Sequence, residues 1–244
     1  MGPAIPHLKR LLRSAIVEQN EEVLLDILWT FTYLTEMDTG SCLDCVPFFI
    51  EHIKRGLPRV ITPALRVVGN IATGNDVETE AVISAGFLEC VPTLMACSKN
   101  GIRKETMWSV SNIAAGSCSQ IQKIIDSGVL PTVIDAARVA TFEVKKEAIF
   151  VLANMLEGSN QEQMKFMTEN EVLVVLCETL PSMVETVLPT VFSSFLALLS
   201  VESLAPLVKI QLENVKETIE KLSLKDEIAS DSAKKILEIL QSDQ

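Results

Sequence analysis

The chain has 244 residues, of which 48% are hydrophobic but only 5% are aromatic. With one Tyr among many Leu, Val, Ile and Ala residues, this composition is typical of helices that pack through aliphatic side chains, so we expect an all-α protein. The formal net charge of −11 at pH 7 argues against nucleic acid and anionic membrane surfaces as partners, because both are negatively charged.

The cysteines indicate a reducing compartment. No basic region followed by an apolar stretch and a cleavage site opens the chain, so we expect no secretion and therefore free thiols. Cys42 and Cys45 form a CxxC pair, but a zinc site needs two more ligands, and His7 and His52 do not form a second pair. We predict no metal and no cofactor. The other cysteines are at positions 90, 97, 118 and 177.

One sequence pattern recurs along the chain. In chain order, its copies are "DILWTFTYLTE" (26–36), "PALRVVGNIATG" (63–74), "ETMWSVSNIAAG" (105–116) and "EAIFVLANMLEG" (147–158). The last three copies are 42 residues apart, and the first precedes the second by 37. A helical unit of this size is typical of armadillo and HEAT repeats, which stack into a superhelix with a long concave groove.

Each unit is expected to contain three helices. The first is short and ends before a Gly, the second begins near "VLPTVIDAA", and the third carries the recurring pattern. Gly86 and Gly128 are 42 residues apart and Asn170 follows after another 42. Since Gly and Asn tolerate a left-handed backbone, we expect these three residues to end the first helices.

Other residues suggest where third helices begin. Thr62 and Pro63 resemble a cap and a first-turn residue of one third helix, and Ser182 with Glu185 resembles a capping box for another. The apolar run 186–201 is short for a membrane span, so we interpret it as a buried helix. Residues 185–200 and 229–240 keep helical periodicity, although Phe195 or Leu196 stands where an Asn is due.

The third helices are predicted to have two different faces. Spacings of three and four place Glu147, Phe150 and Asn154 on one side of their helix. Aliphatic residues fall on the other side, and the helix at 105–115 divides in the same way. The aliphatic residues are Ala148, Leu152, Met155 and Leu156 in one helix and Val110, Ile113 and Ala114 in the other.

The polar face suits an extended basic peptide. An Asn side chain offers a donor and an acceptor to a peptide backbone. Aromatic rings form slots for the stems of Lys or Arg, and carboxylates such as those of Glu105 and Glu147 can meet the cationic tips. In a single repeat, a Trp is more commonly a core residue, and an Asn or a Glu is more commonly a solvated surface residue, than part of a binding site. Recurrence favours binding at Trp108, Asn112, Phe150 and Asn154, whereas at Trp29 and Tyr33 the two interpretations are equally supported.

The segments "TPALRVVGNIATGND", "KETMWSVSNIAAG", "SGVLPTVIDA" and "KKEAIFVLANMLEG" resemble armadillo repeats of importin α, the adaptor that carries nuclear localisation signals. The order W…Y, R…N, W…N, F…N resembles repeats four to seven over residues 26–160, and residues 160–244 resemble diverged later repeats. The resemblance implies one right-handed armadillo solenoid. Its predicted units are 1–40, 41–82, 83–124, 125–166, 167–203 and a C-terminal cap at 204–244.

The resemblance also implies a minor-type signal-binding site. The family positions match as follows: Trp108, Asn112, Phe150 and Asn154 form the site; Glu105, Ser111 and Glu147 hold cargo Arg or Lys; Asn70, Ala72 and Thr73 surround a key lysine; Arg66 separates two sites; and Trp29 and Tyr33 lie at the edge of the major site. Phe150 replaces the usual Trp and weakens its slot, because Phe has a smaller quadrupole and contact area.

The expected partners follow from this resemblance. They are basic nuclear localisation signal peptides and, through residues 200–244, the receptor that exports importin α. The early repeats and the basic segment that recruits importin β are absent from the sequence, so importin β is not expected. We expect the protein in the cytoplasm and the nucleus. The side that would pack against earlier repeats leaves an apolar end at residues 4–17, unless this helix caps it or dimerises.

Two other functional classes differ from a signal receptor in what the sequence should contain. An armadillo scaffold with a repurposed groove would keep the W…N motifs without using them for signals. An enzyme is not expected, because the sequence shows no nucleophile with a matching base, no phosphate loop and no metal constellation.

Overall fold

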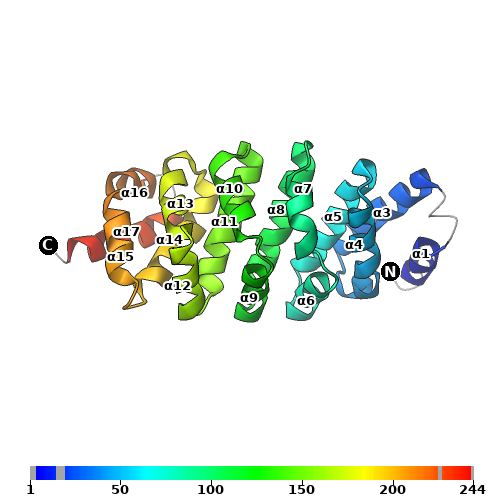
Figure 1. The fold of residues 1–244 in the computed structure, drawn as a ribbon, viewed down its shortest axis with the longest axis horizontal. Helices are drawn as coiled ribbons and strands as arrows, with labels where there is room; N and C mark the ends of the chain where they lie inside the picture. Colours follow the sequence, from blue (N-terminus) through cyan, green and yellow to red (C-terminus); the bar gives the residue numbers. More distant parts are fainter. Residues whose placement is uncertain (1–3, 15–19, 225–226, 243–244) are drawn as a thin grey trace. The chain divides into compact units, whose positions relative to one another are not determined.

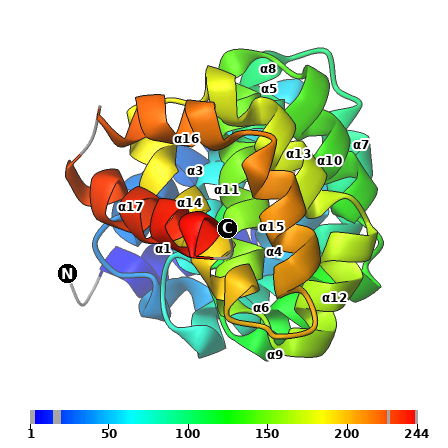
Figure 2. The same cartoon turned by 90° about the vertical axis from the view of Figure 1, so that its left-hand side faces the viewer.

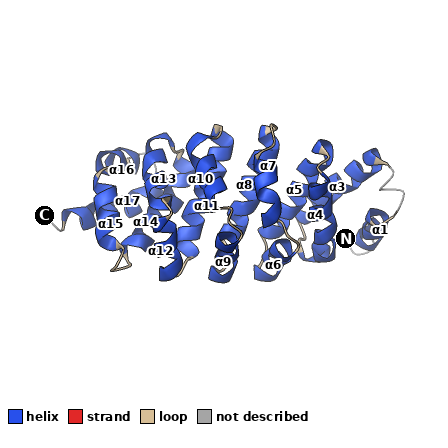
Figure 3. Ribbon diagram, in the orientation of Figure 1, coloured by secondary structure: helices blue, strands red, loops and turns tan. Residues whose placement is uncertain are grey.

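The computed structural model describes residues 4–14, 20–224 and 227–242, and each regular element in these ranges is a helix (Figure 3). The prediction of an all-α protein is therefore confirmed. The chain divides into two compact units, Met1–Gly116 and Ser117–Gln244, which are described separately. None of the helices in the described ranges combines the length and apolarity needed to cross a bilayer.

The third helices form the core of the first unit. Helix α5 packs against α3 on one side and against α8 on the other (Figure 1). In chain order the elements are α1 (Ala4–Leu12), α3 (Glu21–Thr35), the 3-10 helix η1 (Gly40–Cys45), α4 (Val46–Arg55), α5 (Pro58–Ala72), α6 (Asp76–Ser84), the 3-10 helix η2 (Leu88–Cys90), α7 (Val91–Met95) and α8 (Asn100–Ala114).

The second unit repeats this arrangement, with α14 packed between α11 and α17 (Figure 2). Its elements are α9 (Cys118–Asp126), α10 (Leu130–Val139), α11 (Phe142–Gly158), α12 (Gln161–Glu169), α13 (Val172–Thr179), the 3-10 helices η3 (Leu180–Ser182) and η4 (Glu185–Val187), α14 (Leu188–Leu199), α15 (Ala205–Glu213), α16 (Lys216–Ser223) and α17 (Glu227–Gln241). The helices predicted at 185–200 and 229–240 are thus present as α14 and α17.

The predicted order of a short helix, a left-handed residue and two further helices is confirmed at Gly86 (φ 86°) and Gly128 (φ 72°). Asn170 also ends its first helix, as the C-cap residue of α12, but its φ is −100°, so the expected left-handed backbone is wrong for this residue and occurs at Glu171 (φ 67°). The Asn170 side chain donates a hydrogen bond to the Phe166 carbonyl at 2.8 Å. This bond extends the helical turn by one residue and moves the reversal to Glu171.

Both predicted starts of third helices were also wrong. Helix α5 begins at Pro58 after the N-cap residue Leu57, so Pro63 lies inside the helix. The extra turn forms because it buries Val60 and Ile61, and apolar burial outweighs the hydrogen bond that Pro63 cannot donate.

Helix α14 begins later than the predicted capping box. Its N-cap residue is Val187, and Pro189 lies in its first turn. Ser182 ends η3 and donates its hydroxyl to the Thr179 carbonyl at 2.9 Å. The Ser182 side chain is therefore used by the preceding turn and does not cap a helix with Glu185.

The capping boxes occur instead at the start of the first helices α6, α9 and α12. The paired residues are Asn75 with Glu78, Ser117 with Gln120, and Asn160 with Gln163. In each pair the second side chain is buried. Two of these buried side chains also reach another segment: Glu78 accepts a bond from the Thr39 hydroxyl at 2.6 Å, and Gln163 donates to the Cys118 carbonyl at 3.0 Å. The capping boxes therefore recur with the repeat, as the left-handed residues do.

Helix α1 covers the beginning of the first unit. It buries Ile5 and Leu12, and Asp44 in η1 pairs with Lys9 at 2.6 Å and with Arg13 at 3.0 Å. In the predicted apolar end, Ile5 and Leu12 are thus covered but Leu11 is 48% exposed, and residues 15–17 lie outside the described ranges. Partial burial raises the pKa of the Asp44 carboxyl, but the hydrogen bonds and charges of Lys9 and Arg13 lower it by more, so the net shift is downward.

Replacing Asp44→Asn is expected to loosen α1. Because the folded-state pKa of Asp44 is lowered, its stabilising contribution is present above the unfolded-state pKa and is lost as the pH falls through the folded value. Hydrogen exchange followed by mass spectrometry should show faster exchange in α1 of the variant at about pH 7, with a difference that narrows below about pH 4. Glu51→Gln, which removes an exposed pair within α4, is the control, and equal α1 exchange in the two variants would contradict the prediction.

Candidate functional site

Helices α5 and α8 bring most of the predicted site residues together. Glu105, Trp108 and Asn112 follow one another on one side of α8 at spacings of three and four; we call them the α8 group. The opposite side of α8 is apolar, with Val110, Ile113 and Ala114 fully buried. The predicted division of this helix into two faces is therefore confirmed.

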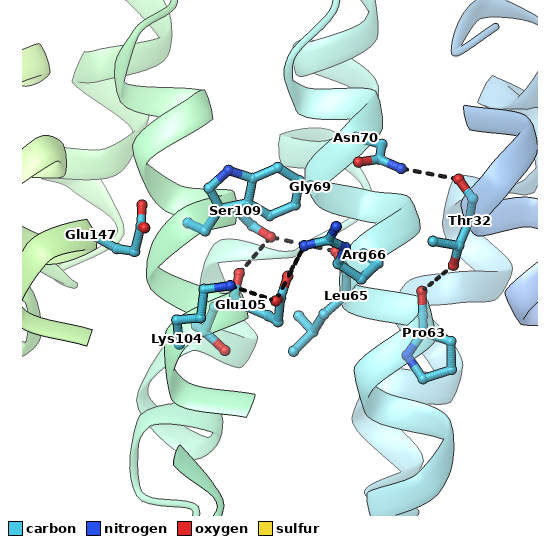
Figure 4. A network of polar contacts seen from close by, with 12 residues as sticks. Thr32, Pro63, Leu65, Arg66, Gly69, Asn70, Lys104, Glu105, Ser109 and Glu147 are labelled. Carbon is cyan, nitrogen blue, oxygen red and sulfur yellow. Dashed lines mark hydrogen bonds and ion pairs between the residues drawn. The ribbon is translucent and has the colours of Figure 1, made fainter. Parts of the chain in front are cut away.

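The Glu105 carboxylate is already paired with two cations of the chain. Arg66 Nη1 lies 3.3 Å from each of the two carboxylate oxygens, and Lys104 Nζ lies 3.0 Å from Oε1 (Figure 4). The Glu105 residue is only 8% exposed, so water screens these pairs less than it screens pairs on the open surface. The carboxylate predicted to receive a cation from a ligand thus holds internal cations.

Trp108 lies against α5 and not in open solvent. The Arg66 guanidinium carbon is 5.1 Å from the centroid of the half-buried ring, within the range of a cation–π interaction. One turn further along α5, a Cβ atom added to Gly69 would overlap the Trp108 ring. The absence of a side chain at Gly69 therefore leaves the space that the Trp108 ring occupies, and we call this space the seat of the ring. The sequence interpretation did not single out Gly69.

The sequence does contain a pattern that distinguishes Gly69. A small residue stands immediately before each recurring Asn, namely Gly69, Ser111 and Ala153, at intervals of 42. Small side chains allow one helix to approach another closely. In the first unit, this small residue is Gly69, where α8 comes close to α5.

The asparagines tie third helices to one another. Asn70 Nδ2 donates to the Thr32 carbonyl at 3.1 Å and to the Thr35 hydroxyl at 3.0 Å, both on α3. Asn112 Nδ2 donates to the Gly69 carbonyl on α5 at 3.2 Å. Asn70 is only 8% exposed and Asn112 is half-buried. Because an amide carries two N–H donors and a carbonyl, the single bond made by Asn112 leaves capacity for a ligand.

The remaining predicted residues of the first unit differ in accessibility. Trp29 and Tyr33 stand four apart on α3 with exposed fractions of 41% and 65%, and Thr73 at the end of α5 is also exposed. Ala72 and Ser111 are buried, and the Ser111 hydroxyl donates to the Trp108 carbonyl at 2.9 Å. A ligand can therefore reach the first three side chains more readily than the last two.

The second unit holds an equivalent set on α11. We call Glu147, Phe150 and Asn154 the α11 group. Glu147 is buried, Phe150 and Asn154 are half-buried, and Lys146 Nζ lies 3.3 Å from Glu147 Oε1. The predicted aliphatic face is also confirmed, since Ala148, Leu152, Met155 and Leu156 are fully buried.

The CxxC pair has the properties of core thiols. Cys42 and Cys45 are buried, and burial raises the pKa of Cys42 to about 11 and also raises the pKa of Cys45. Both thiols are therefore protonated at neutral pH, whereas nucleophiles and metal ligands are thiolates. Within the part of the chain that the structure describes, no three His, Cys, Asp or Glu side chains gather to hold a metal ion.

The sequence is similar to that of importin α subunits. Over 119 residues it is 36% identical to importin subunit alpha-1a of Oryza sativa subsp. japonica. This match covers 45% of this chain and 21% of the rice protein. Over 112 residues it is 37% identical to importin subunit alpha-3 of Arabidopsis thaliana. This second match covers 43% of this chain and 20% of that protein. The matched segment thus spans about a fifth of the length of these relatives. No protein-family model matches the chain.

Solved armadillo proteins share the fold. The designed armadillo repeat protein YIII(Dq)4CqI superposes with a TM-score of 0.84 at 23% identity, covering 97% of this chain and 99% of the other. The designed protein YIII(Dq.V1)4CPAF, in complex with the peptide (KR)4, gives a TM-score of 0.82 at 24% identity, with coverages of 97% and 99%.

The fold and the comparisons together define the class. The chain is an all-α armadillo-repeat solenoid, as the sequence predicted. Within that class it is importin-α-like, because about 45% of the chain is similar to importin α subunits. The resemblance noted in the recurring motifs is thereby confirmed.

Substituting Gly69→Ala is expected to displace the Trp108 ring. The added Cβ would overlap ring carbons, so the free energy of unfolding should fall by about 1–3 kcal/mol and the tryptophan emission should shift. Gly101→Ala is the matched control, because its Cβ would meet nothing within 4 Å and an Ala in a helix is stabilising by about 0.5–1 kcal/mol. Denaturant unfolding with fluorescence detection measures both, and a stable Gly69→Ala protein with unchanged emission would refute the proposed seat.

Proposed function

We propose that the chain binds extended basic peptides of the nuclear localisation signal type, as an importin-α-like adaptor in transport between cytoplasm and nucleus. The observation that carries this proposal is the recurrence of a carboxylate, a ring and an amide in the α8 and α11 groups. In both groups the ring and the amide are half-buried while the opposite face is fully buried. Packing of the core accounts for the buried face, and bonds between third helices use part of the polar face, but neither requires a ring and an amide to stay half-buried in both groups.

The chemistry of each group suits such a peptide. The amides of Asn112 and Asn154 can pair with a peptide backbone, which recognises extended chain without reading its side chains. The rings of Trp108 and Phe150 offer apolar walls to the methylene stems of Lys or Arg. The net charge of −11 attracts a basic ligand from a distance and makes binding sensitive to salt.

The comparisons support the same ligand class. One armadillo protein with this fold is described in complex with the peptide (KR)4, and the relatives similar in sequence are importin α subunits. We extend the proposal to shuttling between cytoplasm and nucleus and to an export-receptor surface within residues 200–244.

The other predicted residues take different roles in this proposal. Asn70 is nearly buried and donates to α3, so we assign it to cohesion between helices. Thr73 is exposed at the end of α5 and can contact the peptide directly. Trp29 and Tyr33 form an exposed aromatic pair on α3, which we propose as a remnant of a second site.

A second candidate function is supported by the internal ion pairs. Glu105 and Glu147, the carboxylates expected to attract a basic peptide, are each paired with lysines of the chain. An armadillo scaffold whose groove binds another kind of protein would have this property. Such a protein would show no saturable binding of Lys/Arg peptides, and a pull-down would recover a consistent acidic or apolar partner.

The double variant Trp108→Ala, Asn112→Ala is expected to bind a fluorescent peptide with a Lys/Arg cluster at least about tenfold more weakly, because it loses a ring wall and a backbone clamp. Fluorescence anisotropy measures this, and wild-type affinity should fall as salt rises from about 50 to 200 mM. Phe166→Ala removes a partly exposed ring on α12, outside the third helices, and should leave affinity unchanged. Unaltered binding by a folded double variant would disprove the site.

A further inference from the structure

A cavity of about 320 Å³ lies in the first unit between α4 and α7, the second helices of consecutive repeats. Its lining side chains come from these two helices, from the first turns of α5, from η2 and from the turn after α7. None of the residues proposed to bind a basic peptide lines it. A molecule of water occupies roughly 30 Å³ in the liquid, so the cavity has room for about ten non-hydrogen atoms, and small-molecule sites have volumes of this order.

The short helix α7 leaves this space. It has 5 residues, whereas the second helices α10 and α13 of the second unit have 10 and 8. There α10 packs on α13, and Arg138 in the last turn of α10 bonds to Glu178 of α13 at 3.0 Å. In the last turn of α4, Lys54 lies 3.7 Å from Glu89 of η2, beyond the distance of a hydrogen bond. The second helices of the first unit therefore have less side-chain surface with which to close the space between them.

The inner wall of the cavity is apolar. Ile53 of α4, Ile61 of α5 and Leu94 of α7 line it and are buried. Cys90 is also buried, and its thiol donates to the Gly86 carbonyl at 3.3 Å, so it needs no polar partner from a ligand. An apolar molecule that contacts these side chains leaves water and gains dispersion contacts on several sides.

The charged lining residues disfavour a charged ligand. The side chains of Lys54 and Glu89 are 50% and 73% exposed, and their opposite charges lie 3.7 Å apart. A ligand carboxylate that pairs with Lys54 would be repelled by Glu89 close by, and a ligand ammonium would meet the reverse arrangement. An uncharged molecule leaves the pair intact.

We propose that the cavity between α4 and α7 binds a small, uncharged, apolar molecule of about ten non-hydrogen atoms. The molecule contacts Ile53, Ile61 and Leu94 together and so joins α4, α5 and α7. This site shares no lining residue with the proposed peptide site, and the inference does not rest on the proposed function.

The test uses three probes that share an eight-carbon chain and differ in charge. Octan-1-ol is uncharged, octanoate is an anion and octylammonium is a cation. Methyl NMR of the full chain follows the signals of Ile53, Ile61 and Leu94, with the buried Ile236 of the second unit as the reference. We expect octan-1-ol to shift the three lining methyl signals with a Kd of roughly 1 mM or below, and both charged probes to bind at least about tenfold more weakly.

Filling the cavity should remove this binding. Thr93→Phe and Cys97→Phe each add a ring at a different lining position. Thr186→Phe is the matched control, because Thr186 is exposed in η4 of the second unit and does not line the cavity. Each filling variant should bind octan-1-ol at least about tenfold more weakly than wild type, whereas the control should stay within about twofold.

Three results would overturn the inference. They are equal or tighter binding of a charged probe, octan-1-ol shifts at Ile236 as large as those at the lining methyl groups, and unchanged octan-1-ol binding in both filling variants. Circular dichroism establishes which variants are folded, and either filling variant alone carries the test. Peptide affinity enters none of these outcomes, so the proposed function stands or fails separately.

Discussion

In the first unit, a side-chain amide of each of two third helices donates a hydrogen bond to a carbonyl near the end of the previous third helix. The Thr73 N–H at the end of α5 bonds to the Asn70 carbonyl, so the Gly69 carbonyl lacks the N–H that a longer helix would supply. Asn112 provides that donor from α8. A buried carbonyl without a donor costs roughly 1–3 kcal/mol, and this bond therefore helps to fix the register between the two helices.

The residues proposed to bind peptide thus also hold repeats together. Trp108 packs on Gly69 and under Arg66, and Asn112 bonds to α5 while its side chain stays half-buried. A rigid support holds the ring and the amide in place, so a ligand does not have to order them on binding. The same coupling means that loss of binding in a variant must be separated from loss of stability.

Much of the fold followed from the sequence because its signals are local. The 42-residue period, the left-handed glycines and the buried sides of α8 and α11 all depend on spacing along one helix or turn. Boundaries were harder to predict. Helix α5 gains a turn by burying Val60, and α12 gains a residue through the Asn170 side chain. Both extensions depend on contacts that periodicity does not register.

The sequence by itself determined which residues share a face, since Glu105, Trp108 and Asn112 must align on any helix with 3.6 residues per turn. Only the tertiary structure decided what these side chains contact. Arg66 is 39 residues from Glu105 in the chain, and the packing of α5 on α8 brings its guanidinium to both the carboxylate and the ring. Ion pairs and ring contacts between helices depend on the distance and register of the helices, which spacing within one helix does not contain.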